Sequence, residues 1–203
     1  MNHSTTQRAG SRLRPHPSAG HIAFLRGFLR NPAQVGSVIP SSHQLEQRLV
    51  ERSGVRHART VVELGPGTGG TTRALLAAMA PGASLLGIEL DAEFLRHLRV
   101  TLTDSRLILQ QGSAENLGEY LDVHGLGAAD AIVSGIPFST MPPDVCDRIA
   151  ASIARVLRPG GRFVAYQVRA HVSGYVSPYL GEPKMEWECV NVPPVRVFTW
   201  VKA

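Results

Sequence analysis

Cysteine is scarce in this sequence, and long apolar runs are missing. The two cysteines, Cys146 and Cys189, form no CxxC pair and have no histidine at zinc-site spacing. We therefore expect no metal centre and no disulfide framework, only structural thiols in a reducing compartment. No stretch reaches the ~20 apolar residues that cross a bilayer, and the first twenty residues lack the apolar segment of a secretion signal. These absences predict a cytoplasmic protein.

Acidic residues are also scarce near the amino terminus. Through Arg59 the chain carries nine arginines against Glu46 and Glu51, a charge of +7, whereas the whole chain of 203 residues carries +5. This uneven distribution indicates an anionic partner for the amino-terminal part, either nucleic acid or an acidic membrane surface. A solvated basic tail without a partner is the alternative. The length fits one domain, which we expect to be monomeric.

The first 52 residues divide into two segments. Residues 1–19 are polar and aperiodic, and we expect a disordered basic tail. Residues 20–30 form a predicted amphipathic helix, in which Arg26 and Arg30 lie opposite an apolar face. That face consists of Ile22, Phe24, Leu25, Phe28 and Leu29. A second helix is predicted after Ser41 and Ser42, whose hydroxyl groups suit an N-cap.

The rest of the chain, residues 53–203, alternates between strand-like and helix-like segments. This alternation is typical of a doubly wound, Rossmann-like α/β fold with a mostly parallel sheet. The last two strands are joined by the short Asn191–Pro194 segment, which predicts an antiparallel hairpin. The predicted strands are 60–64, 84–90, 106–110, 130–134, 162–168, 185–190 and 195–201, and the predicted helices are 71–79, 92–102, 115–121 and 143–157.

A glycine-rich turn follows the first of these strands. Glu63, Gly65 and Gly67 lie in an E-x-G-x-G-x-G pattern, and Glu89 ends the next strand 22 residues after Gly67. Glycines let a ligand approach the backbone, and an acid at this distance binds ribose hydroxyls. A purely structural turn and a nicotinamide-dinucleotide site are the alternatives. The acid at the strand end favours a ligand with a cationic amino group.

These residues resemble the glycine motif and the following acid of the seven-stranded S-adenosylmethionine-dependent methyltransferases. The resemblance implies that S-adenosylmethionine is the cofactor and that the strand order is 3-2-1-4-5-7-6. It covers residues 60–203. It also implies a set of cofactor-binding residues: Glu63, Gly65, Gly67, Thr68, Glu89, Leu90, Ser113, Ala114 and Ser134.

The loop after the fourth predicted strand reads Ser134-Gly135-Ile136-Pro137-Phe138. Methyltransferases that act on base amines carry Asn or Asp where Gly135 stands, so this chain lacks their principal adenine-binding side chain. The loop keeps an aromatic residue, Phe138, and a ring near a developing ammonium group is attractive. We therefore predict that Phe138 faces the methyl acceptor; the alternative is a core residue.

Three stretches resemble the bacterial phospholipid N-methyltransferases, which convert phosphatidylethanolamine to phosphatidylcholine. They are residues 24–42, 134–138 and 191–197. The resemblance implies that residues 20–52 include a lid over the cofactor, with Ser37 and Ile39 near it. It also implies a peripheral enzyme at the inner leaflet of the cytoplasmic membrane, bound through the 20–30 helix. That helix packing only as a lid is the alternative.

The acceptor end of the site is less sharply defined. Catalytic candidates in and after the fifth predicted strand are Tyr166, His171, Tyr175 and Tyr179, and Arg169 and Arg196 are candidate phosphate contacts. Two other functions stay open: an rRNA adenine N6-methyltransferase and a non-catalytic S-adenosylmethionine-binding protein. A phospholipid substrate is favoured over nucleic acid.

Overall fold

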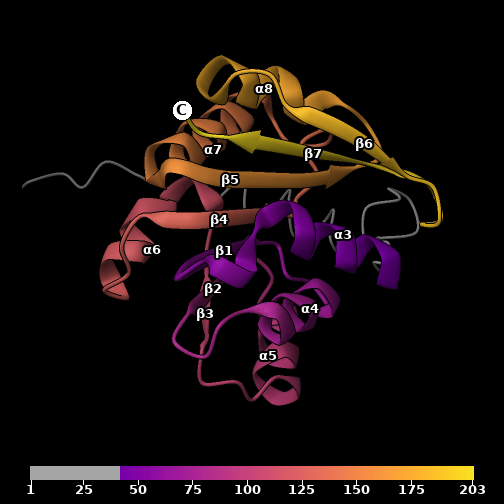
Figure 1. The fold of residues 1–203 in the computed structure, drawn as a ribbon. Coiled ribbons are helices and arrows are strands. Elements are labelled where there is room, and N and C mark those ends of the chain that lie inside the picture. Colours follow the sequence, from indigo (N-terminus) through magenta and orange to yellow (C-terminus); the bar gives the residue numbers. More distant parts are fainter. Residues whose placement is uncertain (1–41) are drawn as a thin grey trace, which may run out of the picture.

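The computed structural model describes residues 42–203, which form one seven-stranded sheet (Figure 1). The strand order is β3-β2-β1-β4-β5-β7-β6. β1 to β5 pair in parallel, while β7 runs antiparallel to both β5 and β6. The predicted fold class, order and closing hairpin are confirmed. The strands are β1 (Thr60–Leu64), β2 (Ser84–Glu89), β3 (Leu107–Gln111), β4 (Ala129–Ser134), β5 (Leu157–Gln167), β6 (Lys184–Glu188) and β7 (Val195–Val201).

Helices cover both faces of the sheet and bury two apolar layers. One layer joins α3 and α4 to β1, β2 and β4, and the other joins α6, α7 and α8 to the opposite face. α5 lies beside β2 and β3. The helices are α3 (His43–Ser53), α4 (Gly70–Ala78), α5 (Ala92–Thr101), α6 (Leu117–Val123), α7 (Pro143–Val156) and α8 (His171–Leu180), with short 3₁₀ turns η1 (Val55–His57) and η2 (Ala114–Asn116).

α8 corrects one expectation, because the sequence predicts no helix between the fifth and sixth strands. Gly174 and Pro178 lie inside this helix, and both residues disfavour a helix interior. Val172 and Val176, one turn apart, are nevertheless fully buried against the core. Packing of this apolar stripe therefore outweighs weak local propensity.

The start of α3 confirms the predicted N-cap. The Ser42 hydroxyl accepts a hydrogen bond from the Leu45 N–H at 3.2 Å, which satisfies one of the free donors at the helix end. The predictions for the 1–19 tail, the 20–30 helix and the lid residues Ser37 and Ile39 lie outside the described residues. Among residues 42–203, no helix is long and apolar enough to cross a membrane.

Candidate active site

A cavity of about 290 Å³ opens at the carboxyl ends of the parallel strands. This is the edge where doubly wound sheets bind ligands, at the point where the chain reverses its order between β1 and β4. Four loops contribute, each directly after a strand: 65–68 after β1, 89–90 at the end of β2, 112–114 after β3 and 135–137 after β4. Each of these loops was singled out in the sequence.

The loop after β1 brings bare backbone to the cavity. Gly65, Gly67 and Gly69 have φ values of 74°, 54° and 85°, a left-handed conformation that glycine adopts without steric cost. A Cβ atom built on Gly65 would lie 2.8 Å from the Ile136 side chain, whereas one built on Gly67 meets nothing within 4 Å. Gly65 therefore lets the loops after β1 and β4 touch, and Gly67 leaves space for a ligand.

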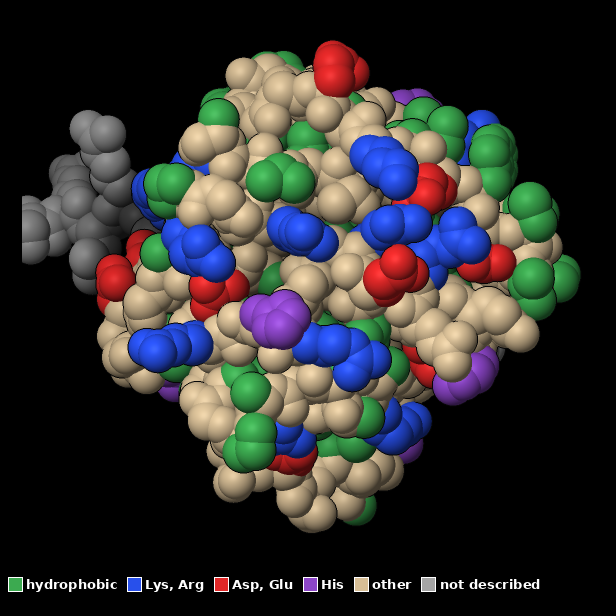
Figure 2. Space-filling view, in the orientation of Figure 1, with side chains coloured by type: hydrophobic (Ala, Val, Ile, Leu, Met, Phe, Trp, Pro, Cys, Tyr) green, Lys and Arg blue, Asp and Glu red, His purple; other side chains and the backbone are tan. Residues whose placement is uncertain are grey.

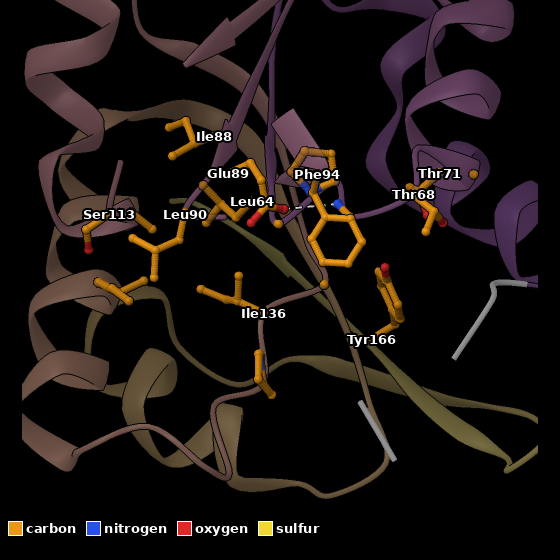
Figure 3. A pocket seen from close by; sticks show the side chains of 18 of the residues that line it. Leu64, Thr68, Thr71, Ile88, Glu89, Leu90, Phe94, Ser113, Ile136 and Tyr166 are labelled. Carbon is orange, nitrogen blue, oxygen red and sulfur yellow. Dashed lines mark hydrogen bonds between the residues drawn. The ribbon is translucent and has the colours of Figure 1, made fainter. Parts of the chain in front are cut away.

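Glu89 lies near the centre of the cavity and holds the glycine loop (Figure 3). Its Oε2 accepts from the Gly67 N–H at 3.1 Å, and its Oε1 accepts from the Asp91 N–H at 2.9 Å. Only 3% of the residue is exposed, and this burial raises the pKa of its carboxyl group, with the backbone donors opposing the rise. Glu89 is thus a buried acceptor facing a cavity.

Glu63, on β1, is a second buried carboxyl group close to the first. Its Oε2 has no hydrogen-bond partner among residues 42–203, and the residue does not line the cavity directly. Burial raises its pKa to about 7; the Thr72 hydroxyl lowers it and the charge of Glu89 raises it further. Two desolvated carboxyl groups at one strand edge favour a cationic ligand, because a positive charge would stabilise both ionised forms.

The structure brings together most of the predicted cofactor residues. Thr68, Leu90, Ser113 and Ala114 all line the cavity with the glycines and Glu89. In Figure 3, Ser113 lies to the left of Glu89, and Thr68 and Thr71 lie to the right. Ser134 is fully buried at the end of β4 and is not part of the lining. Its carbonyl end instead leads into the lining loop 135–137.

Phe138 does not line the cavity. It is 1% exposed and belongs to the core between the sheet and α7, with its ring centroid 6.3 Å from that of Tyr175. The structure therefore favours the alternative, in which Phe138 is a core residue. The Cys146 thiol, on α7, donates to the Phe138 carbonyl oxygen and so holds this part of the loop against α7.

The other acceptor candidates lie apart from the cavity lining. His171 begins α8 and is exposed, Tyr179 is half exposed, and Tyr175 packs partly buried against the core. Arg169 is exposed. Arg196 donates to the Val168 carbonyl oxygen and lies 4.1 Å from the Trp187 ring centroid. These candidates therefore do not form one cluster around the cavity.

Several lining residues were not predicted. Phe94 reaches the cavity from the first turn of α5, Thr71 and Arg73 from α4, and Met141 from the segment before α7. Phe94 could have been predicted from the sequence, since it is a large apolar residue just after the strand that ends in Glu89. Tyr166, on β5, was one of four equal candidates in the sequence, and it is the one that lines the cavity.

A family model described as "Methyltransferase domain" matches residues 61–161, the span that holds the glycine loop, Glu89 and the loop after β4. The chain is an S-adenosylmethionine-dependent methyltransferase. It is 28% identical over 177 residues to an ornithine lipid N-methyltransferase of Singulisphaera acidiphila, covering 86% of this chain and 92% of that one. It is 32% identical over 113 residues to the ribosomal RNA small subunit methyltransferase A of Parasynechococcus marenigrum. That match covers 55% of this chain but only 36% of the relative.

Solved methyltransferases share the fold. An O-methyltransferase from Bacillus cereus in complex with SAH superposes with a TM-score of 0.65 at 14% identity, covering 89% of this chain and 91% of that one. The O-methyltransferase TomG from Streptomyces achromogenes, in complex with SAM, gives 0.63 at 17%, covering 88% and 89%.

The residues at this strand edge fit S-adenosylmethionine. Glu89 can accept from ribose hydroxyls, and the bare Gly67 backbone leaves room for the ligand. Glu63 does not line the cavity, but its buried carboxyl group on β1, with a partnerless Oε2 among residues 42–203, favours the cationic amino acid end. Ser113 and Ala114, after β3, stand where the adenine edge is expected.

The affinity for S-adenosylmethionine and for S-adenosylhomocysteine should depend on the ionisation of Glu63. Because its folded-state pKa is about 7, the carboxylate that attracts the ligand's ammonium group is lost as the pH falls below 7. We expect S-adenosylhomocysteine affinity to decrease from pH 7.5 to pH 6, by at most about tenfold per unit. Calorimetric titration of Glu63→Gln should show a flat profile; an equally steep profile in this variant would contradict the assignment.

The same pKa shift affects stability with a definite sign. Between the ordinary pKa of 4.5 and about 7, Glu63 is ionised in the unfolded chain and protonated in the folded one. The folded state binds more protons there, so the free energy of unfolding falls as the pH rises through this window. Glu63→Gln should remove that decrease, which denaturant titrations at pH 5 and pH 7.5 measure.

Proposed function

We propose that this enzyme methylates the head-group amine of phosphatidylethanolamine and of its mono- and dimethyl forms. The observation that supports a lipid amine as the acceptor is the nearly end-to-end similarity to an ornithine lipid N-methyltransferase. The choice of phosphatidylethanolamine as the head group rests on the resemblance of residues 24–42, 134–138 and 191–197 to the bacterial phospholipid N-methyltransferases. The similarity to rRNA methyltransferases covers only 32% to 48% of the length of those enzymes. The composition of the loop after β4 also supports a lipid acceptor, because Gly135 offers no side-chain amide to a base.

Tyr166 takes the space that a side chain at position 135 would need. A Cβ atom on Gly135 would lie 2.5 Å from the Tyr166 hydroxyl oxygen and 3.4 Å from the Gly65 carbonyl oxygen. An Asn or Asp at this position is therefore excluded unless Tyr166 moves. We infer that the phenol of Tyr166, extending from β5, takes the place of the missing side chain. Its oxygen accepts a hydrogen bond from the N–H of the unmethylated and monomethyl amines; the dimethyl amine, which has no N–H in its neutral form, is positioned by the apolar lining alone.

The loop 135–137 after β4 is held against the glycine loop 65–68. The Gln167 side-chain amide donates to the Ile136 carbonyl oxygen at 2.6 Å, and the Ile136 side chain packs beside Gly65. Leu64, Ile88, Leu90 and Ile136 give this part of the cavity an apolar lining (Figure 3). Rigid contact between the two loops fixes the relative positions of donor and acceptor, which is the main way an enzyme accelerates a transfer of this kind.

The bound cofactor supplies an electrophilic methyl group. The chain's own residues must present the amine in its neutral form, since a primary amine has a solution pKa near that of lysine, about 10. The apolar lining lowers the pKa of an entering amine by desolvation. The Tyr166 oxygen then orients the nitrogen lone pair, and solvent at the cavity mouth receives the displaced proton.

Removing the Tyr166 hydroxyl should affect turnover more than donor binding. For Tyr166→Phe we expect kcat to fall by about tenfold, the equivalent of one hydrogen bond to the reacting group, with unchanged S-adenosylhomocysteine affinity. Tyr179→Phe is the matched control, because that ring is half exposed on α8. Equal turnover of the two variants would contradict the role given to Tyr166.

The acceptor class is tested with labelled donor. The enzyme is incubated with S-adenosylmethionine carrying a labelled methyl group and, in parallel, with phosphatidylethanolamine vesicles, ornithine-lipid vesicles or ribosomal RNA. Label in the phosphatidylethanolamine fraction is the expected result. Label confined to ornithine lipid would correct the head group, and label confined to RNA would overturn the proposal. We further propose that the enzyme acts at the inner leaflet of the cytoplasmic membrane, and that residues 20–30, whose sequence predicts an amphipathic helix, contact its anionic surface.

A further inference from the structure

The turn between β6 and β7 buries polar side chains and exposes apolar ones. Within residues 188–192, Glu188 and Asn191 are buried, with 3% and 2% exposed, whereas Val190 is 59% exposed and Val192 is 84% exposed. Loops of water-facing proteins normally expose their polar residues and bury their apolar ones. A loop with the opposite arrangement therefore points to a partner that is itself apolar.

Specific hydrogen bonds enforce this arrangement. The Asn191 Oδ1 accepts from the Ser42 N–H at 3.0 Å, and its amide donates to the Pro193 carbonyl oxygen. Glu188 accepts from the Val190 N–H at 3.1 Å and pairs with Arg48 at 3.0 Å. Because the polar side chains are used to hold the loop, the outward direction of the two valines is fixed by the fold.

The apolar character continues beyond the turn. Trp187, at the end of β6, is 46% exposed, and Val168, just after β5, is 40% exposed. Arg196 connects them, since its guanidinium stacks on the Trp187 ring and donates to the Val168 carbonyl oxygen. Figure 2 shows hydrophobic side chains projecting at the right-hand edge, where Figure 1 places the turn between β6 and β7.

This surface stands at the same sheet edge as the cavity. β7 is antiparallel to β5, with Tyr166 opposite Val197 and Gln167 opposite Arg196, so the turn before Val195 lies next to the carboxyl end of β5. The start of α3 also places the turn near the cavity. Ser42 donates its N–H to Asn191 of the turn, and Glu46, one turn further along α3, lines the cavity.

Charge complements the apolar residues. Arg169 is exposed beside Val168, and Arg196 covers Trp187. Both carboxylates of β6 are paired with arginines of α3, Glu188 with Arg48 and Glu186 with Arg52. This composition is typical of a membrane-interface site. In such sites apolar side chains reach the acyl boundary, tryptophan lies at head-group depth, and arginines bind anionic phosphates.

We propose that this hairpin surface, made of Val168, Arg169, Trp187, Val190, Val192 and Arg196, docks the enzyme on an anionic bilayer. This inference rests on the proposed function and deepens it. Docking here turns the cavity mouth toward the head groups, so that a lipid amine enters while its acyl chains stay in the membrane.

Trp187 reports on this contact directly. The chain has two tryptophans, and the other, Trp200, is 1% exposed and stacked between Phe163 and Phe198. With phosphatidylethanolamine–phosphatidylglycerol vesicles whose acyl chains carry bromine, the wild-type protein should lose tryptophan emission. Trp187→Phe should show no such loss. Unquenched wild-type emission in a sample that pellets with the vesicles, or failure to pellet at all, would overturn the proposal.

Substitution of the valines supplies a second test. Val190→Asp with Val192→Asp should weaken vesicle partition by at least about tenfold, with unchanged S-adenosylhomocysteine affinity. Val100→Asp with Val123→Asp is the matched control, since both valines are 75% exposed on α5 and α6, outside the surface. Equal partition of the two double variants would contradict the proposal.

Turnover separates this inference from the function on which it rests. With water-soluble short-chain phosphatidylethanolamine, the Val190→Asp, Val192→Asp variant should match the wild type, and with vesicles it should fall with partition. A wild type that methylates neither form of the lipid refutes the proposed function, while quenching still decides whether the hairpin surface enters a bilayer.

Discussion

Replacing Glu89 by alanine is expected to lower S-adenosylhomocysteine affinity by roughly ten- to over a hundredfold. Hydrogen bonds to a charged acceptor contribute about 1.5–3 kcal/mol, and this carboxylate also holds the Gly67 N–H and the Asp91 N–H. The variant should still fold, because removing a desolvated carboxyl group relieves a cost that is visible in its raised pKa.

Calorimetric titration measures the affinity, and circular dichroism checks the fold. Glu93→Ala is a suitable control, since Glu93 is exposed on the first turn of α5, four residues from Glu89 and outside the cavity lining. Affinity of Glu89→Ala equal to that of the control would remove Glu89 from the cofactor site.

The second large effect is expected at Gly67. A methyl group there meets no protein atom within 4 Å, so it projects into the space assigned to the cofactor. For Gly67→Ala we expect S-adenosylhomocysteine affinity to fall by at least about tenfold, because the methyl group displaces the ligand from the backbone. The left-handed φ of 54° adds a stability loss of about 1–2 kcal/mol.

Gly125→Ala is a control that separates the loss of ligand affinity from the loss of stability caused by the left-handed backbone. Gly125 has a φ of 64°, its Cβ would also meet nothing within 4 Å, and it lies in the turn after α6, outside the cavity lining. Both variants should lose similar stability in denaturant titrations, and only Gly67→Ala should lose affinity. If both bind S-adenosylhomocysteine like the wild type, the glycine loop does not approach the cofactor.

The parts of the fold that rest on local periodicity were predictable from the sequence. β1 was predicted to its observed bounds, 60–64, and β2 to within one residue, since alternating elements with β-branched strands determine a parallel sheet. α8 was missed because Gly174 and Pro178 lower local helix propensity, and the two buried valines that stabilise it act only after the core forms. That contact joins residues far apart in the chain, so local sequence patterns do not reveal it.

The cofactor side of the site was more predictable than the acceptor side for a similar reason. Gly65, Gly67 and Glu89 act through spacing along the chain, and all three line the cavity. Whether Phe138 or Tyr166 faces the cavity depends on how the loop turns after Pro137 and on which face of β5 packs inward. Those are properties of tertiary packing, and they place Phe138 in the core and Tyr166 at Gly135.

The most direct test of lipid methylation is mass analysis of the lipid itself. Wild-type enzyme and Glu89→Ala are each incubated with phosphatidylethanolamine vesicles and S-adenosylmethionine bearing a deuterated methyl group. The account predicts deuterated methyl groups on the head-group nitrogen with the wild type and strongly reduced incorporation with the variant at limiting donor. An unlabelled lipid after prolonged incubation with folded, S-adenosylhomocysteine-binding wild-type enzyme would contradict it.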